Sequence, residues 1–282
     1  MTTGRRPLVA ILLVTAPVFV GIGYSVLAAA GVVGAGATGW SISRIVSVLS
    51  ERAVWSGLGW SLWVAAASTA LATAGAVVIA VCFRGASRGD RIARSLAILP
   101  LPIPHLVAAA GAVLLLGQSG YLARFGTALG LLSKPDAMPA LIYDRLGVGL
   151  IVALAWKEIP FLVLVAGAVL AARGSALEEV GRTLGASPAA IFRRVTWPIL
   201  WRGLLPAIVA VFSFAAGTYE ATALLAPSDP LALSLLTYER YSDAALARHA
   251  DAFVLVLLGT GVSVLAVAAH EWARSRWERL GA

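Results

Sequence analysis

The chain has 282 residues, of which 60% are hydrophobic and 13% are charged, and its formal net charge at pH 7 is +8. Water-soluble globular domains average about 45–50% apolar and about 25% charged residues, so this composition excludes a soluble globular domain. It also excludes a disordered chain, which combines low hydrophobicity with high charge. The single cysteine, Cys82, excludes an internal disulfide and a metal site built from several thiolates.

Six stretches are long and apolar enough to cross a bilayer, since a spanning helix needs about 20 apolar residues. They cover residues 8–30, 57–83, 96–117, 148–172, 203–226 and 252–270. The first stretch is longer than the apolar run of a cleaved signal peptide, so we expect it to remain as a span. Residues 64–81 lack the alternation of a membrane β-strand. The sequence therefore predicts an all-α integral membrane protein with six transmembrane helices in one domain, residues 1–282.

The basic residues orient these spans, because Lys and Arg flanks stay on the cytoplasmic side of a membrane. With the N-terminus inside, the predicted inner segments carry 14 basic residues and the outer segments carry 7. This asymmetry predicts that both termini are cytoplasmic. We interpret the clusters as topology determinants and contacts to membrane lipid. We expect no nucleic-acid partner, since nothing in the chain resembles a recognition module.

Three prolines, Pro100, Pro102 and Pro104, lie near the inner end of the third predicted span. Proline has no amide hydrogen and cannot complete the hydrogen bonds of a helix interior, so this helix starts late or bends there. A late start of this helix is the simpler of these two outcomes.

Three charged residues fall inside predicted spans. Lys157 and Glu158 lie near the middle of the fourth, and Glu220 lies in the outer half of the fifth. A charge at the bilayer centre costs about 2.5–3.5 kcal/mol on insertion scales. Such residues therefore form structural pairs, for instance Lys157 with Glu220, or line a pathway. We hypothesise that Tyr219 and Glu220 line or gate a translocation pathway, with Lys157 as a counter-charge and Glu158 in the same candidate set.

The segment between the fourth and fifth spans, residues 173–202, is longer than the few residues that a plain connector needs. Residues 175–184 predict a short helix, in which Glu178 and Arg182 have the i,i+4 spacing of an ion pair. Gly185 suits the left-handed position after its last turn.

A second helix follows at once. Ser187 suits its N-cap and Pro188 its first turn, and we expect Pro198 to end or kink it as the chain enters the membrane. The pattern predicts a stiff helix–turn–helix elbow on the cytoplasmic side. The alternative is an amphipathic hairpin on the membrane surface, which the spacing of Ile191, Val195 and Ile199 also permits.

This segment resembles the "EAA" loop of permease subunits in binding-protein-dependent ABC importers. The family pattern is E-A-A, three residues, G, nine residues, I, one residue, L-P. Here Glu179–Gly181 stand for E-A-A, Gly185 for the glycine, Val195 for the isoleucine and Trp197-Pro198 for L-P. The spacings fit, while both alanines, the isoleucine and the leucine are replaced. The stretch TLGASP at residues 183–188 is also typical of the family.

Weaker resemblances cover more of the chain. Residues 99–111 are similar to the proline-rich start of the third span in such permeases, and residues 159–170 to the fourth span. Residues 217–226 resemble the G-E-F-G-A-T-L segment of the sulfate, molybdate, iron, thiamine and polyamine branch. This chain departs from that segment, because Tyr219 stands between the glycine and Glu220.

The resemblance implies a function and partners. The chain would be the permease half of an ATP-driven solute importer in the bacterial cytoplasmic (inner) membrane. A second permease subunit, two ATPase subunits and an extracytoplasmic substrate-binding protein would be its partners. The loop would contact the ATPase and transmit its closure to the spans, through Glu178, Glu179, Gly181, Arg182, Gly185, Ala186, Ser187, Pro188, Ile191 and Pro198.

Enzymatic activity is not expected of this chain by itself. It lacks the G-x-x-x-x-G-K-[ST] loop that cradles nucleotide phosphates, so ATP and Mg²⁺ are expected in the partner ATPases and no cofactor on this chain. Two alternatives stay open at this point. One is a secondary transporter driven by an ion gradient, although internal repeats typical of that class are not evident. The other is a membrane-embedded enzyme, for which the sequence offers no catalytic motif.

Overall fold

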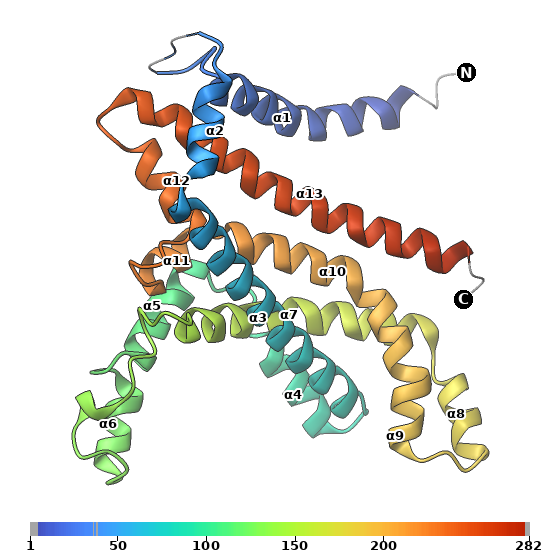
Figure 1. Ribbon diagram of the computed structural model, residues 1–282. Coiled ribbons are helices and arrows are strands. Elements are labelled where there is room, and N and C mark those ends of the chain that lie inside the picture. Colours follow the sequence, from blue (N-terminus) through green and yellow to red (C-terminus); the bar gives the residue numbers. More distant parts are fainter. Residues whose placement is uncertain (1–4, 36, 38, 280–282) are drawn as a thin grey trace. The chain divides into compact units, whose positions relative to one another are not determined.

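The computed structural model describes residues 5–35, 37 and 39–279 (Figure 1). All regular elements in these residues are helical. The α-helices are α1 (Arg5–Ala29), α2 (Ile42–Ser50), α3 (Arg52–Cys82), α4 (Arg88–Ile98), α5 (His105–Leu116), α6 (Tyr121–Ala128), α7 (Val148–Arg173), α8 (Ala176–Thr183), α9 (Pro188–Ile191), α10 (Trp197–Gly217), α11 (Glu220–Leu225), α12 (Leu233–Tyr241) and α13 (His249–Arg279).

Six helical segments of the described chain are long and apolar enough to cross a membrane, which confirms the predicted number of spans. They are Ile11–Ala29, Arg52–Cys82, His105–Ala128, Val148–Arg173, Pro188–Gly217 and Leu246–Arg276. Both the fold class and the approximate place of each span therefore follow from the apolar runs of the sequence.

The boundaries of the third and fifth spans were predicted wrongly. The third begins at His105 rather than at residue 96, because Pro100, Pro102 and Pro104 separate α4 from α5; the late start expected from these prolines is confirmed. The fifth does not continue to residue 226. Its helix ends at Gly217, Thr218 takes an extended conformation, and the short helix α11 starts at Glu220.

The structure divides into two compact units, residues 1–59 with 230–264, and residues 60–229 with 265–282. In the first unit an apolar core joins α1, α2, the start of α3, α12 and α13, and its fully buried members include Val48, Val54 and Leu255. Ion pairs between Arg240 and Glu51 and between Arg44 and Asp251 link the same helices.

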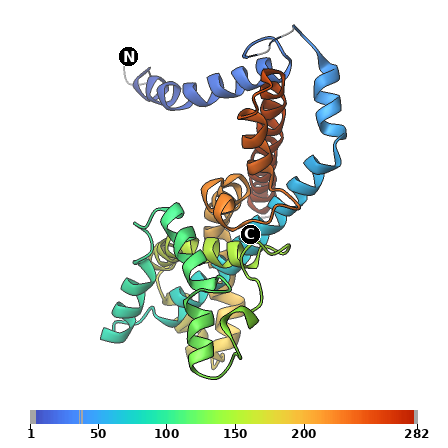
Figure 2. The same cartoon turned by 90° about the vertical axis from the view of Figure 1, so that its left-hand side faces the viewer.

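The second unit is built around α3, α7 and α10 (Figures 1 and 2). Their buried side chains include Leu162, Leu200 and Leu204. Small residues let these helices approach closely, as packing in membranes requires. A Cβ atom on Gly203 would lie only 2.5 Å from the Val169 side chain, so α10 lies directly against α7 there. This unit carries the segment that follows α7 and the charged residues of the predicted spans.

Candidate functional site

Helix α8 ends in a turn that its sequence specifies. Ser175 occupies the N-cap position, and its hydroxyl donates to the carboxylate of Glu179 one turn later. At the other end Gly185 has φ +77°, the left-handed conformation predicted for it. The amides of Gly185 and Ala186 donate to the carbonyls of Arg182 and Gly181 at 3.0 and 2.9 Å. These two bonds form a Schellman motif, which satisfies the last carbonyls of the helix.

The second helix of the segment begins as predicted, and of the two outcomes expected at Pro198, an end or a kink, the structure excludes the end. The Ser187 hydroxyl accepts from the amide of Ala190 at 3.3 Å, and Pro188 occupies the first turn. The π-helical segment Phe192–Thr196 then joins α9 to α10 without a break. Because Pro198 has no amide hydrogen, it is tolerated where wider turns rearrange the hydrogen bonds around it. Figure 1 shows that this helix bends along its length while it continues into the membrane span.

Helices α8 and α9 pack against each other at Gly181, which has no side chain. A Cβ atom on Gly181 would lie 3.2 Å from the Ile191 side chain, tighter than an ordinary van der Waals contact. Ile191 is buried. The predicted elbow is therefore a packed pair of helices, with its turn at Gly185 and a continuous helix beyond it.

A buried carboxylate, that of Glu178, fixes the base of this pair. Its Oε2 lies 2.6 Å from Nη2 of Arg84 and its Oε1 accepts from Nη1 of Arg84 at 2.8 Å. The hydroxyl of Thr196, also buried, donates to Oε1 at 2.7 Å. Glu178 thus joins three segments: the chain just after α3, helix α8 and the π-helical turn before α10.

This arrangement corrects the predicted i,i+4 pair between Glu178 and Arg182. Arg84 holds the carboxylate through two parallel bonds, the geometry in which arginine binds carboxylates most strongly. The hydrogen bond from Arg84 holds the pKa of Glu178 below its ordinary value, against the opposing effect of burial, and the Thr196 hydroxyl and the Arg182 charge lower this pKa further. The same hydrogen bond raises the pKa of Arg84. Both groups are therefore charged at neutral pH.

A cleft of about 520 Å³ opens beside this cluster, among the ends of α3 and α7 and the helices α4 and α8. Arg84, Arg94, Glu178 and Arg182 give it a polar rim. Arg94 donates to the carbonyls of Phe83 and Gly85 and so caps the end of α3. The rim therefore holds three positive charges and one negative charge.

Lys157 and Glu158 point to different partners, as their adjacent positions on α7 require. Lys157 is buried, and its Nζ donates to the carbonyl of Leu101 at 3.2 Å. That carbonyl lies between α4 and α5, in the segment that the prolines keep from being helical. It therefore has no hydrogen bond from a helical amide. The carboxylate of Glu158 lies 2.9 Å from Nε2 of His105 at the start of α5, and the His105 ring contacts Phe214 of α10 with centroids 4.6 Å apart.

The pairing considered for Lys157 and Glu220 does not occur between these two described residues, since Lys157 binds Leu101 instead. Glu220 is exposed and starts α11, while Tyr219 occupies the position before it. Because α10 ends at Gly217, Tyr219 and Glu220 lie at a break between two helices rather than inside a continuous span. The structure therefore does not join the four candidate pathway residues into one cluster.

Sequence reasoning missed Arg84, Thr196 and His105. Arg84 belonged to a group of basic residues attributed to topology, and its partner is 94 positions away. For His105 the sequence did offer a signal. An imidazole begins a membrane helix directly after the proline-rich stretch, in a chain that also carries Glu158 within a span. For Thr196 the sequence offered none.

The chain is similar to known transport proteins. A family model described as "Binding-protein-dependent transport system inner membrane component" matches residues 72–279. The molybdenum transport system permease protein ModB of Mycobacterium tuberculosis is 30% identical over 211 residues, which cover 71% of this chain and 76% of that protein. The sulfate transport system permease protein CysT of Synechocystis is 30% identical over 169 residues, 59% of this chain and 56% of that protein.

Solved structures show the same fold at low sequence identity. A bacterial ABC transporter that imports the acidic polysaccharide alginate contains a chain with a TM-score of 0.74 and 17% identity, covering 96% of this chain and 93% of that one. The MetNI methionine ABC transporter in an inward-facing conformation gives a TM-score of 0.56 with 18% identity over 83% of this chain and 97% of that one.

Proposed function

Because this chain belongs to the family of binding-protein-dependent transport system inner membrane components, the permease subunits of ABC importers, we propose that it forms half of the pore of an ATP-driven importer. The two compact units would act as one transmembrane domain with both termini in the cytoplasm. A second permease subunit, two ATPase subunits that bind ATP and Mg²⁺, and an extracytoplasmic binding protein would complete the assembly in the bacterial inner membrane.

The elbow formed by α8, α9 and the turn at Gly185 would couple the ATPase to the spans. Its support is that α8 and α9 pack against each other and that α9 continues without a break into the membrane helix α10. A flexible loop would absorb a displacement of the ATPase, whereas a capped and packed pair of helices transmits it to the membrane span. For the ATPase to change the state of the spans, its contacts with the elbow must differ between two conformations of the transporter.

The cargo that we propose is a small inorganic oxyanion. Relatives that are 30% identical over 211 and 169 residues are named for molybdenum and sulfate transport. A cargo of Fe³⁺ or thiamine type is the second candidate, since relatives matched over shorter segments or smaller shares of their length are named for these.

Copurification tests the assembly. A tagged copy of the chain, extracted from native membranes, is expected to bring down an ATPase and a substrate-binding protein. Vesicles that contain the purified complex should take up radiolabelled molybdate or sulfate only with ATP inside and the binding protein outside. Uptake by the chain alone, driven by a proton or sodium gradient, would instead establish a secondary transporter.

Glu220 and Tyr219 are the residues we propose for the pathway or its gate. If the carboxylate charge matters, Glu220→Gln and Glu220→Ala both reduce uptake; if only its hydrogen bonding matters, the Gln variant retains uptake and the Ala variant loses it. Initial uptake rates in the reconstituted complex distinguish these outcomes. Normal uptake by both variants would exclude a role for Glu220 in the pathway.

A further inference from the structure

The helical chain of the second unit is interrupted at two places that lie next to each other. Residues 99–104 separate α4 from α5, and residues 218 and 219 separate α10 from α11. His105, the first residue of α5, contacts the ring of Phe214 with centroids 4.6 Å apart. Phe214 comes three residues before α10 ends at Gly217, a rise of about 4.5 Å along the helix axis. The two breaks are therefore neighbours in space.

The helices that follow the two breaks pack against each other. Helix α5 contacts α11, and Figure 1 shows the two side by side. Both of them also contact α7, and so do α4 and α10, the helices that precede the breaks. Helix α7 is therefore the common support of the helices on either side of the breaks, and α5 and α11 form one packed pair upon it.

The backbone of the first break does not fix its own shape. Three of its six residues are prolines, which have no amide hydrogen. The amides of Leu101 and Ile103 donate to carbonyls three residues back, so they form turns rather than a helix. The angle between α4 and α5 therefore depends on contacts from outside the segment.

Two adjacent residues of α7 supply such contacts, one at each side of Pro102 and Pro104. The Nζ of Lys157 donates to the carbonyl of Leu101 before these prolines, at 3.2 Å. Oε1 of Glu158 lies 2.9 Å from Nε2 of His105, directly after them. Helix α7 thus holds both ends of the stretch that carries no helical hydrogen bonds.

The two contacts differ in how easily they can open. Lys157 is only 6% exposed, and breaking its bond would leave a buried charge without that partner. The side chains of His105 and Glu158 are 29% and 12% exposed. Ionisable groups in spans face the bundle interior or a water-filled cavity, so water can replace either partner of this pair. The Lys157 bond is therefore the fixed contact and the Glu158 bond the exchangeable one.

We propose that the contact between Glu158 and His105 is a latch that holds the α5–α11 pair against α7 in one state of the transporter and opens in the other. This inference rests on the proposed function, because a transporter that alternates between two states needs a contact that opens. The bond between Lys157 and Leu101 stays closed and acts as the pivot. Tyr219 and Glu220 lie at the second break and move with the pair.

Hydrogen–deuterium exchange on the purified permease complex tests the latch. Glu158→Ala is expected to speed amide exchange about tenfold in residues 99–112 and also in residues 218–226, since the loss of one hydrogen bond to a charged group raises the open fraction by that order. The response of residues 218–226 is decisive, because a purely local effect of the substitution stays near residues 99–112. Unchanged exchange in residues 218–226 would overturn the latch.

Further variants of the same pair separate the latch from a general loosening of the structure. Glu158→Gln keeps an oxygen that accepts from His105, so its exchange should stay near that of the wild type. His105→Ala should match Glu158→Ala, and the double variant should exceed neither, because all three lack the same contact. Effects that add in the double variant would overturn the proposal.

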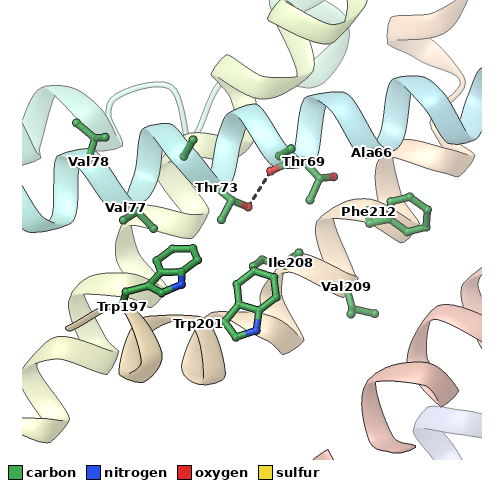
Figure 3. Close-up of a pocket in the computed structure, with 12 residues that line it drawn as sticks. Ala66, Thr69, Thr73, Val77, Val78, Trp197, Trp201, Ile208, Val209 and Phe212 are labelled. Atoms are coloured by element: carbon green, nitrogen blue, oxygen red, sulfur yellow. Dashed lines mark hydrogen bonds between the residues drawn. The ribbon is translucent and has the colours of Figure 1, made fainter. Parts of the chain in front are cut away.

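Two phenylalanines of α10 provide a matched pair of controls. Phe214→Ala removes the ring that packs on His105 and should speed exchange in residues 99–112. Phe212 lies two residues earlier, and its ring lines the apolar groove between α3 and α10 (Figure 3). Phe212→Ala should therefore leave exchange in residues 99–112 unchanged. Equal effects of the two substitutions would overturn the role of the His105 contact.

A second measurement needs no substitution and so does not depend on the folding of variants. In the unmodified complex, a non-hydrolysable ATP analogue should change exchange in residues 99–112 and 218–226 together, an effect that a merely structural contact would not produce. Equal exchange with and without the analogue would overturn the latch. The failure of the latch and that of the proposed function are distinguishable, because exchange reports on the first and ATP-driven uptake on the second.

Discussion

Replacing Gly185 by valine is expected to abolish most transport while ATP hydrolysis continues. Gly185 has φ +77° and a Cβ there would meet no atom within 4 Å, so the penalty is backbone strain rather than a clash. An L-residue in this conformation costs about 1–2 kcal/mol, and a β-branched one is least tolerated. Such strain shifts the ratio of the native turn to other conformations by a factor of about 5–30, and uptake should fall as the native turn is depopulated.

Gly185→Asn is the matched control, because asparagine tolerates the left-handed region. It should retain most of the uptake. Both variants are assayed in vesicles for uptake and for phosphate release from ATP. A valine variant with wild-type uptake would refute the elbow as the coupling element, and equal losses in both variants would show that side-chain size rather than backbone conformation matters.

Removing the side chain of Arg84 is expected to destabilise the whole elbow. Glu178 would stay buried with the Thr196 hydroxyl as its remaining hydrogen-bond partner and with the charge of Arg182 nearby. Leaving a buried acceptor without its partner costs about 1–3 kcal/mol, and because Arg84 is itself 43% exposed, water reduces this to the lower part of the range. The melting temperature of the purified complex should fall by a few degrees, and transport should fall with it.

Arg84→Lys and Arg91→Ala complete this experiment. Lysine keeps the charge but not the two parallel bonds, so its effect should lie between those of the wild type and Arg84→Ala. Arg91 is exposed on α4, and its loss should change the melting temperature little. If Arg84→Ala and Arg91→Ala were equivalent, the ion pair with Glu178 would have no structural role.

The pH dependence of stability offers an independent check on the same pair. The folded pKa of Glu178 is lowered, so its contribution is complete above the ordinary carboxyl pKa of about 4.3 and is lost as the pH falls through the lowered folded value. The wild type should therefore lose more stability on acidification than Glu178→Gln, whose amide does not titrate. The same loss of melting temperature in the two proteins from about pH 5 down to about pH 2 would contradict this assignment.

Local sequence signals were sufficient wherever one or two turns of chain decide the structure. The apolar runs specify six spans because a bilayer demands about 20 apolar residues for each. Gly185, Ser187 and Pro188 specify the turn and the start of the second helix, since caps act within one helical turn. The loop motif and the likeness to ABC permeases rest on these same local features.

Tertiary structure alone decided which partners the buried polar groups have. The i,i+4 spacing offered Glu178 only a weak, solvated pair with Arg182, whereas a buried carboxylate requires strong donors, and Arg84 supplies them from 94 positions away. Lys157 likewise turns to the carbonyl of Leu101, which the proline-rich segment leaves without an amide. The continuation of the helix past Pro198 and its end at Gly217 also depend on neighbours in space, because a π-helical turn and a helix break are stable only where packing supports them.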